Sequence, residues 1–372
     1  MKWRLVRPLT LTVRAGLCEV DPVARQLPAL TLEQLTVELG SRARAVETLR
    51  WLFDQRPMPT ALPDTIPGVS HRVWTPFIAR QGLVIPKVTE RLESPDGTTK
   101  YALDFAGTNV ETVRIPAKGR STICISSQAG CTRKCVFCAT KELGFIRQLK
   151  AEEMIAQYML ARSEAPVEQP ASNVVFMGMG EPMDNLDEVL HAIDVLTQSP
   201  APQLRQVAVT VSTSGVLPGL ERFLAESKAS LALSLNATTD EVRAQVMPQN
   251  KTWPIESLLN ALRKDVERRN GKRDYFIEYV LFKDLNDTDA DADRLITLLE
   301  GIPSRVNLIP YNPYPGTGLE TPSESRVRAF HARLVEQGML TLIRWPRGRE
   351  IAAACGQLVL SRDGEGFQPS AL

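Results

Sequence analysis

From about residue 121 to residue 337, short apolar segments alternate with longer segments of helical periodicity. Strands are predicted at residues 173–178, 207–212, 231–235, 275–281 and 306–309, and helices at residues 151–162, 186–197, 255–269, 289–299 and 323–337. This alternation predicts a parallel sheet with helices outside it, an α/β fold. Because the units carry no dinucleotide-binding fingerprint, we expect an open or partial barrel with functional side chains at the carboxyl ends of its strands.

The other segments predict smaller units around this barrel. Residues 1–28 show no clear period and are left as an unassigned lead. In residues 29–85, two amphipathic stretches around Gly40 predict a small N-terminal helical accessory domain. Residues 86–116 alternate apolar and polar side chains about a turn at residues 94–97, which predicts a strand-rich connector containing a hairpin. The catalytic barrel then occupies residues 117–362, and residues 363–372 form a tail.

Composition and charge exclude some classes of function. The 372 residues include 43% hydrophobic side chains, enough to bury a sizeable core. A formal net charge of +1 predicts no broad attraction to polyanions, so any contact with RNA would depend on local basic patches. No segment reaches the roughly 18 to 20 continuous apolar residues of a membrane span, and no signal peptide is recognised. We therefore expect a cytoplasmic protein that does not associate with membranes.

Three cysteines with the spacing C-x3-C-x2-C follow the apolar segment at residues 121–127: Cys131, Cys135 and Cys138. Three thiolates this close can hold one iron–sulfur cube and leave its fourth iron without a protein ligand. A structural zinc site is one alternative, but it needs four ligands and the sequence offers no second cysteine pair. A structural disulfide is disfavoured, because a chain of this size in a reducing compartment does not need one.

Small and polar residues gather where the predicted strands end. The strand at residues 173–178 continues into Gly180 and Glu181, where glycine lets the backbone approach a ligand and a carboxylate can accept hydrogen bonds from an ammonium group. Comparable positions after the later strands are Ser212, Ser234, Leu235, Asn236 and Asn312. Each alone is typical of a turn. Their shared place at successive strand ends predicts one ligand site.

The cysteine spacing, together with the segment Met-Gly-Met-Gly-Glu-Pro at residues 177–182, resembles the radical S-adenosylmethionine (radical SAM) enzymes. This resemblance implies a partial (βα)6 radical SAM barrel and a 4Fe-4S cluster on the three cysteines. It also implies that S-adenosyl-L-methionine (SAM) binds at the strand ends named above. In this family the cluster cleaves SAM to a radical, so the cofactors carry the difficult chemistry.

Two further cysteines and one carboxylate narrow the resemblance. Cys355 lies in Ala-Ala-Ala-Cys-Gly-Gln-Leu, Cys124 stands seven residues before the first cysteine of the run, and Glu111 lies in Val-Glu-Thr-Val. From about residue 30 to residue 360 the chain resembles the RlmN/Cfr family of RNA adenosine methyltransferases. Without that resemblance, a lone cysteine is more often a small apolar core residue, and a strand carboxylate is more often exposed.

The resemblance implies a role for each of these residues. Cys355 would take a methyl group from SAM and then form a covalent link to RNA. Cys124 would attack the sulfur of that link and leave a disulfide, while Glu111 would accept the proton of the ring carbon. The implied target is carbon 2 of adenosine in 23S rRNA, with tRNA as a second substrate. A flavodoxin or ferredoxin is the expected reductant, and the protein is expected to be a monomer.

Some alternatives stay open. Asn236 stands where the family commonly has histidine, so methylation of carbon 8, as in Cfr types, or a different RNA target is an alternative. A non-catalytic RNA-binding factor is another, whereas an electron carrier is disfavoured because carriers usually complete the cluster with a fourth cysteine. The candidate RNA contacts, with a solvated surface as the equally weighted alternative, are Arg147, Lys150, Arg344, Trp345, Arg347 and Arg349.

Overall fold

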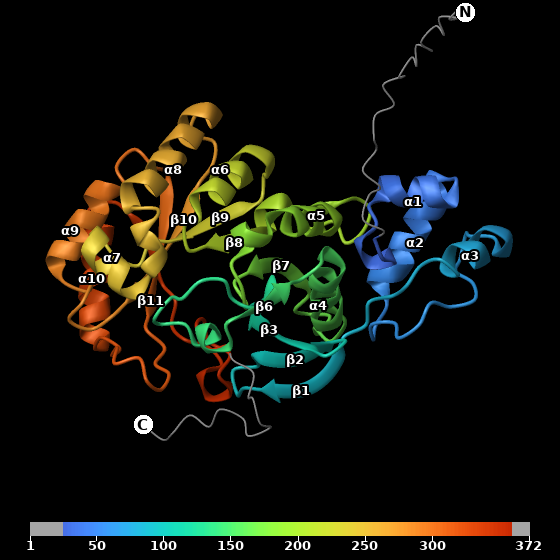
Figure 1. Cartoon of the computed structure of the whole chain (residues 1–372), viewed down its shortest axis with the longest axis horizontal. Helices are drawn as coiled ribbons and strands as arrows, with labels where there is room; N and C mark the ends of the chain where they lie inside the picture. The colour runs from blue at the N-terminus through green and yellow to red at the C-terminus, as the bar shows by residue number, and fades with distance from the viewer. Residues whose placement is uncertain (1–24, 359–372) are drawn as a thin grey trace, which may run out of the picture.

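The central element of the fold is a ten-stranded sheet with the strand order β1-β2-β3-β4-β7-β8-β9-β10-β11-β12 (Figure 1). The computed structural model describes residues 25–358, so most of the predicted lead and the whole predicted tail lie outside it. From β4 to β12 every neighbouring pair of strands is parallel. These strands are β4 (Arg120–Cys124), β7 (Ala171–Phe176), β8 (Val209–Thr213), β9 (Ser230–Ser234), β10 (Tyr275–Leu281), β11 (Ser304–Pro310) and β12 (Leu340–Ile343). The predicted α/β fold with a partial barrel is confirmed.

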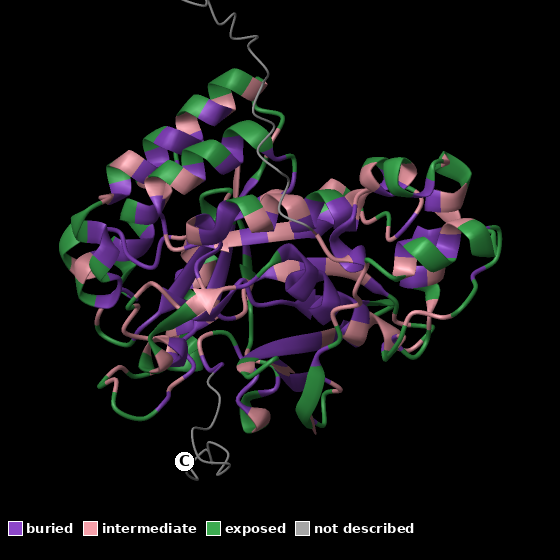
Figure 2. Cartoon of the chain, turned by 45° about the vertical axis from the view of Figure 1, so that its right-hand side comes forward, coloured by how far each residue is buried: buried purple, intermediate pink, exposed green. Residues whose placement is uncertain are grey.

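Helices connect the parallel strands and cover the outer face of the sheet, with buried sides toward the sheet and exposed sides outward (Figure 2). They are α4 (Ala151–Ser163), α5 (Leu186–Thr197), α6 (Leu217–Glu226), α7 (Asp240–Val246), α8 (Ile255–Arg269), α9 (Asp289–Leu298) and α10 (Glu324–Glu336). Two of these helices were not predicted from the sequence: α6, whose first turn contains Pro218 and Gly219, and the short helix α7. Within residues 25–358, no helix combines the length and apolar character that a membrane crossing requires.

An antiparallel extension continues the sheet beyond β4. It consists of β1 (Lys87–Glu93), β2 (Thr99–Phe105) and β3 (Thr108–Ala117). The predicted hairpin is confirmed, since the Ser94 N–H donates to the Thr98 carbonyl at 2.8 Å across the β1–β2 turn. Strand β3 pairs with β4 so that Val113 lies opposite Cys124. The extension therefore attaches the strand that carries Glu111 directly to the barrel.

Three helices precede the sheet: α1 (Leu32–Leu39), α2 (Arg42–Asp54) and α3 (His71–Ile78). The predicted break at Gly40 is confirmed, because this residue adopts a left-handed conformation after α1. The Thr31 hydroxyl caps α1 by accepting from the Gln34 N–H at 3.2 Å. These helices form the predicted helical unit (right side of Figure 1), while the domain boundaries stay a prediction.

The loop after β7 passes very close to residues 126–128. A Cβ atom on Gly180 would lie 2.6 Å from Gln128 Cβ, and the φ angle of Gly180 is +107°. A Cβ atom on Gly178 would lie 2.7 Å from Ser126 Oγ. Both values are too short for real contacts, so packing of the chain against itself requires glycine at these two positions.

Gly180→Ala should therefore lower the free energy of unfolding of the cluster-free protein by about 2–4 kcal/mol, since the added methyl group must displace Gln128. Gly271→Ala is the matched control, because Gly271 also has a positive φ but no atom within 4 Å of its Cβ position. The control should lose only about 1 kcal/mol through backbone strain. Urea denaturation followed by circular dichroism measures both losses, and equal losses would contradict the packing argument.

Candidate active site

The predicted cluster cysteines lie on a loop between β5 (Gln128–Gly130) and the 3-10 helix η2 (Ala139–Leu143). Strand β5 pairs with β6 (Phe145–Gln148), which follows η2. The Cys131 N–H donates to the Gly144 carbonyl at 2.9 Å. The small two-stranded sheet therefore holds the cysteine loop at both ends.

The three thiols are close enough to affect one another's ionisation. Burial raises the pKa of Cys135 to about 12, and the charge of Cys138 adds to this effect. The Arg133 N–H donates to Cys131 Sγ at 3.3 Å, and Gln249 Nε2 donates to Cys135 Sγ at 3.6 Å. Hydrogen bonds to sulfur are a usual feature of iron–sulfur sites, and bound iron would favour the thiolate form.

Within residues 25–358, no three Cys, His, Asp or Glu side chains approach closely enough to share a single metal ion. Three cysteines on one loop fit an iron–sulfur cluster that the protein ligates at three of its irons.

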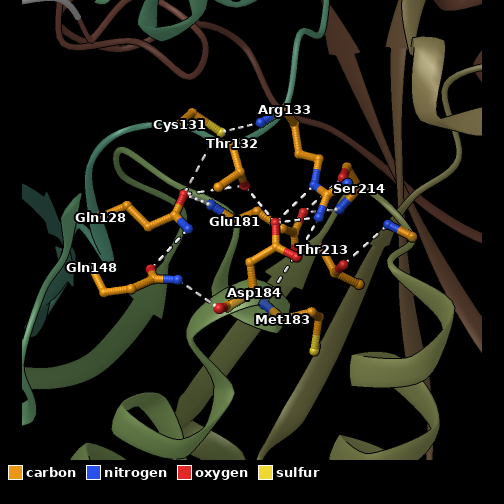
Figure 3. A network of polar contacts seen from close by, with 11 residues as sticks. Gln128, Cys131, Thr132, Arg133, Gln148, Glu181, Met183, Asp184, Thr213 and Ser214 are labelled. Atoms are coloured by element: carbon orange, nitrogen blue, oxygen red, sulfur yellow. Dashed lines mark hydrogen bonds and ion pairs between the residues drawn. The ribbon is translucent and has the colours of Figure 1, made fainter. Parts of the chain in front are cut away.

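Polar contacts tie the cysteine loop to the loop after β7 (Figure 3). Gln128 Oε1 accepts from the Glu181 N–H at 2.9 Å and from the Thr132 N–H at 3.3 Å. Arg133 and Asp184 form an ion pair, with 2.8 Å between Nε and Oδ2. These bonds fix the positions of the cysteines relative to Glu181.

The Glu181 carboxylate is buried, and both of its oxygens accept hydrogen bonds. Its Oε1 accepts from the Met183 N–H at 3.1 Å, and its Oε2 accepts from the Ser214 N–H at 2.8 Å and hydroxyl at 2.7 Å. Burial raises the pKa of this carboxyl group, and the bonds from Ser214 oppose that rise. The sequence analysis did not single out Ser214, although it lies two residues after Ser212 at the same strand end.

Arg243 organises the ends of β8 and β9 and was missed by the sequence analysis. Its side chain is fully buried, and burial lowers its pKa to about 10. Nε donates to the Leu235 carbonyl at 2.8 Å, while Nη2 donates to the carbonyls of Ser214 at 2.7 Å and Ser234 at 3.0 Å. One guanidinium group therefore sets the geometry of two strand ends that carry predicted cofactor contacts.

Most of the predicted cofactor contacts line one cavity of about 620 Å³. These are Gly180, Glu181, Ser212, Ser234, Asn236 and Asn312, together with the cysteines Cys131, Cys135, Cys138 and Cys355. Leu235 is fully buried and does not line the cavity. The polar atoms of Asn236 are used within the protein, since Oδ1 accepts from the Val280 N–H at 2.8 Å and Nδ2 lies 3.3 Å from Met247 Sδ.

Asn312 offers the cavity an unused acceptor. Its Nδ2 donates to the Cys355 carbonyl at 3.2 Å. Its buried Oδ1 has no hydrogen-bond partner among the described residues. Because a buried carbonyl oxygen without a partner is unfavourable, this atom fits a site that is completed by a polar ligand such as SAM.

The segment that carries Cys355 is docked onto the cysteine loop. The Ala139 N–H donates to the Gly356 carbonyl at 2.7 Å, and the Thr140 hydroxyl donates to the Leu358 carbonyl at 2.8 Å. The Cys355 side chain is exposed where it lines the cavity. Desolvation by the surrounding protein raises its pKa to about 12, and the charges of Cys124 and Cys138 add to this effect. Cys355 therefore lies beside the loop that carries the cluster cysteines and lines the same cavity.

Glu111 lies inside the protein and is only 2% exposed, which excludes the alternative of an exposed strand carboxylate. Its Oε1 lies 2.9 Å from Nζ of Lys100, which is also buried. Lys100 Nζ donates in addition to the Ala352 carbonyl at 3.4 Å. One ammonium group therefore connects Glu111 to the segment that carries Cys355.

The disulfide expected from the sequence is absent. Cys124 and Cys355 are both free thiols, so the structure does not support a standing bond between them. Cys124 is buried next to the Met177 backbone, with a pKa raised to about 12 mainly by burial. Any disulfide between the two residues would have to belong to a step of turnover.

Three of the candidate RNA contacts are engaged within the protein. Arg147 forms an ion pair with Glu153 at 2.7 Å, and Arg347 donates to the Pro116 carbonyl. Arg344 Nε donates to Asn307 Oδ1 at 3.1 Å. Arg344, Trp345 and Arg347 are nonetheless exposed, and all three line the cavity.

Arg344 belongs to a chain of polar groups that the sequence analysis missed. Asn307 Nδ2 donates to Oε1 of Glu278 at 2.8 Å, and both residues line the cavity. Burial raises the pKa of the Glu278 carboxyl group, while Asn307 and Arg344 oppose that rise. Glu278 could have been identified from the sequence, because it is a single carboxylate in the otherwise apolar strand segment Phe-Ile-Glu-Tyr-Val-Leu.

Comparisons with known proteins agree with this geometry. Residues 125–296 match the model of the radical SAM superfamily. A relative from Myxococcus xanthus named dual-specificity RNA methyltransferase RlmN 2 is 42% identical over 348 residues, which are 91% of this chain and 90% of the relative. The RlmN of Bdellovibrio bacteriovorus is 37% identical, over 90% of this chain and 84% of its own. A crystal structure of a radical SAM methyltransferase from Sphaerobacter thermophilus matches with a TM-score of 0.82 and 34% identity, over 90% of this chain and 98% of that one. This chain therefore belongs to the RlmN family of radical SAM RNA methyltransferases.

Proposed function

We propose that this enzyme methylates carbon 2 of adenosine in RNA, with 23S rRNA as the first expected substrate and tRNA as the second. The names of the curated relatives support an RNA substrate. The observation that carries the proposal is that Cys355 opens into the same cavity as Glu181 and the three cluster cysteines. A methyl group held on Cys355 would lie within reach of a base that enters this cavity.

When bound, the 4Fe-4S cluster at the three cysteines and SAM at the strand ends supply the methyl group and the one-electron chemistry. Carbon 2 of adenine is electron-poor and has no lone pair, so it does not accept a methyl cation by simple displacement. In our proposal Cys355 therefore carries the methyl carbon on its sulfur. This methyl group gives up one hydrogen atom to the radical chemistry that SAM would supply, and the resulting methylene carbon forms the bond to the ring. RNA and protein are then joined through Cys355. The adduct then gives up the proton of the ring carbon and one electron, which would return to the cluster.

Two other residues complete the reaction in this proposal. Glu111 accepts the proton from the ring carbon, and its ion pair with Lys100 supports this role by orienting the carboxylate. The thiolate of Cys124 then attacks the sulfur of Cys355. The bond between that sulfur and the methylene carbon breaks, the carbon takes a proton and becomes the methyl group, and a disulfide forms. An external thiol must then reduce this disulfide by thiol exchange, whereas flavodoxin or ferredoxin is the candidate electron donor for the cluster.

Mass mapping of rRNA and tRNA from a strain that lacks the gene should show the loss of one or more 2-methyladenosines. Re-introduction of the wild-type gene should restore them, whereas a Cys355→Ala gene should not. If the deletion strain lacks an 8-methyladenosine instead of a 2-methyladenosine, the methylated atom is carbon 8 and not carbon 2. Unchanged RNA modification would reject the proposed function.

Anaerobic reconstitution should load the wild-type protein with about one 4Fe-4S cluster, and Cys131→Ala should prevent this because a ligand is lost. Cys124→Ala is the matched control and should keep the cluster, since Cys124 lies outside the ligand set. Iron and sulfide analysis with electron paramagnetic resonance measures the loading. A wild-type protein that binds no iron would contradict the assignment of the three cysteines.

Cys124→Ala should accumulate a covalent protein–RNA adduct, because the thiol that breaks the link is missing. The adduct is measured as a shifted band on a denaturing gel that ribonuclease removes. The double variant Cys124→Ala/Cys355→Ala should give no adduct. Continued turnover of Cys124→Ala without any adduct would reject the resolving role of Cys124.

A further inference from the structure

We propose that Glu278, Asn307 and Arg344 select the target base. In this arrangement Glu278 accepts a hydrogen bond from the exocyclic amine of adenine, and Arg344 donates one to the neighbouring ring nitrogen. The inference rests on the proposed function and deepens it, because it names the groups that distinguish adenine from other purines.

Two of the three residues are in register on neighbouring strands, and the third follows the next strand. Glu278 on β10 is in register with Asn307 on β11, and Asn307 is in register with Leu342 on β12, two residues before Arg344. All three polar residues line the main cavity. Because β12 is an edge strand of the described sheet, this polar row lies beside the open side of the partial barrel.

The row has unused hydrogen-bonding capacity. Asn307 bridges Glu278 and Arg344, which form no direct ion pair within residues 25–358. In the same part of the chain, no hydrogen bond reaches Oε2 of Glu278 or the terminal Nη atoms of Arg344. Glu278 is only 7% exposed, so its remaining acceptor is largely shielded from bulk water. A ligand that carries a hydrogen-bond donor next to an acceptor could bond to Glu278 Oε2 and to the Nη atoms of Arg344 at the same time.

Adenine presents this pattern of groups. Its amine lies beside the acceptor N1 on the Watson–Crick edge and beside the acceptor N7 on the Hoogsteen edge. Guanine and inosine carry an acceptor oxygen in place of the amine, which would face the carboxylate unfavourably. Apolar side chains beside the row, Ile115, Phe276, Ile343 and Trp345, also line the cavity and can cover the faces of a flipped base.

The position of Cys355 favours the base over SAM as the partner of this row. Glu278, Arg344 and Cys355 all line the same cavity. The base must reach this thiol, because the methyl group travels on it. The ring atom next to N1 is carbon 2, and the ring atom next to N7 is carbon 8, so the same row can serve either methylation site.

Glu278→Gln tests the inference, because its amide nitrogen can donate to the O6 oxygen of inosine whereas the carboxylate cannot. The probe is a fluorescein-labelled RNA hairpin that carries the adenosine identified by mass mapping, or inosine at the same position. Binding to cluster-loaded enzyme is followed by fluorescence anisotropy. Wild type should prefer adenosine by about 10- to 100-fold, and Glu278→Gln should reduce this ratio by about tenfold or more.

Asp274→Asn is the matched control, since it removes a carboxylate just before β10, where Asp274 is exposed and paired with Arg305. It should leave the base preference unchanged. Probes with 1-deazaadenosine and 7-deazaadenosine show which ring nitrogen Arg344 contacts, and one of them should bind about tenfold more weakly.

An unchanged ratio in Glu278→Gln, combined with weaker SAM binding, would assign Glu278 to the cofactor and overturn the inference. An unchanged ratio with unchanged SAM binding would also overturn it. Either result would leave the mapped methylation, and hence the proposed function, intact. Mapping that finds no methyladenosine would instead reject both.

Discussion

The candidate active site depends on contacts that hold a C-terminal segment, residues 352–358, against earlier parts of the chain. Residues 352–358 are held by the backbone bond from Ala139 to Gly356, by the side-chain bond from Asn312 to the Cys355 carbonyl, and by the bond from Lys100 to the Ala352 carbonyl. These bonds come from the cysteine loop, from the loop after β11 and from β2. Cys355 can approach the cluster cysteines only because three distant parts of the chain fix the backbone on either side of it.

Buried charged groups form the second constraint. Glu111, Glu181, Arg243 and Glu278 are all buried, and each ionised group loses the hydration that it has in the unfolded chain. Hydrogen bonds or an ion pair compensate each of them: Lys100 for Glu111, Ser214 for Glu181, backbone carbonyls for Arg243, and Asn307 for Glu278. The barrel therefore holds its polar groups in fixed positions around the cavity, a property that favours orientation of a substrate over flexible binding.

In our proposal, the two sides of this cavity serve the cofactors and the RNA. The cysteine loop is fastened to Glu181 through Gln128 and the Arg133–Asp184 ion pair, and this side suits the cluster and the amino acid part of SAM. The row from Glu278 to Arg344 lies toward the edge strand β12. In our proposal Cys355 lies between the two sides and carries the methyl carbon from one to the other.

Features that depend on local order could be predicted from the residues alone. Short-range periodicity and turn chemistry predicted the alternation of strands and helices, the break at Gly40 and the hairpin at residues 94–97. The spacing of Cys131, Cys135 and Cys138 is read directly from the sequence, and resemblance to a family added Cys124, Cys355 and Glu111 as a set. Three features became visible only in the folded chain: Asn236 uses its polar atoms within the protein, Arg243 holds two strand ends, and Glu278, Asn307 and Arg344 form one row. The reason is physical: backbone hydrogen bonding sets local periodicity, whereas contacts between distant residues depend on strand register and on how the loops dock.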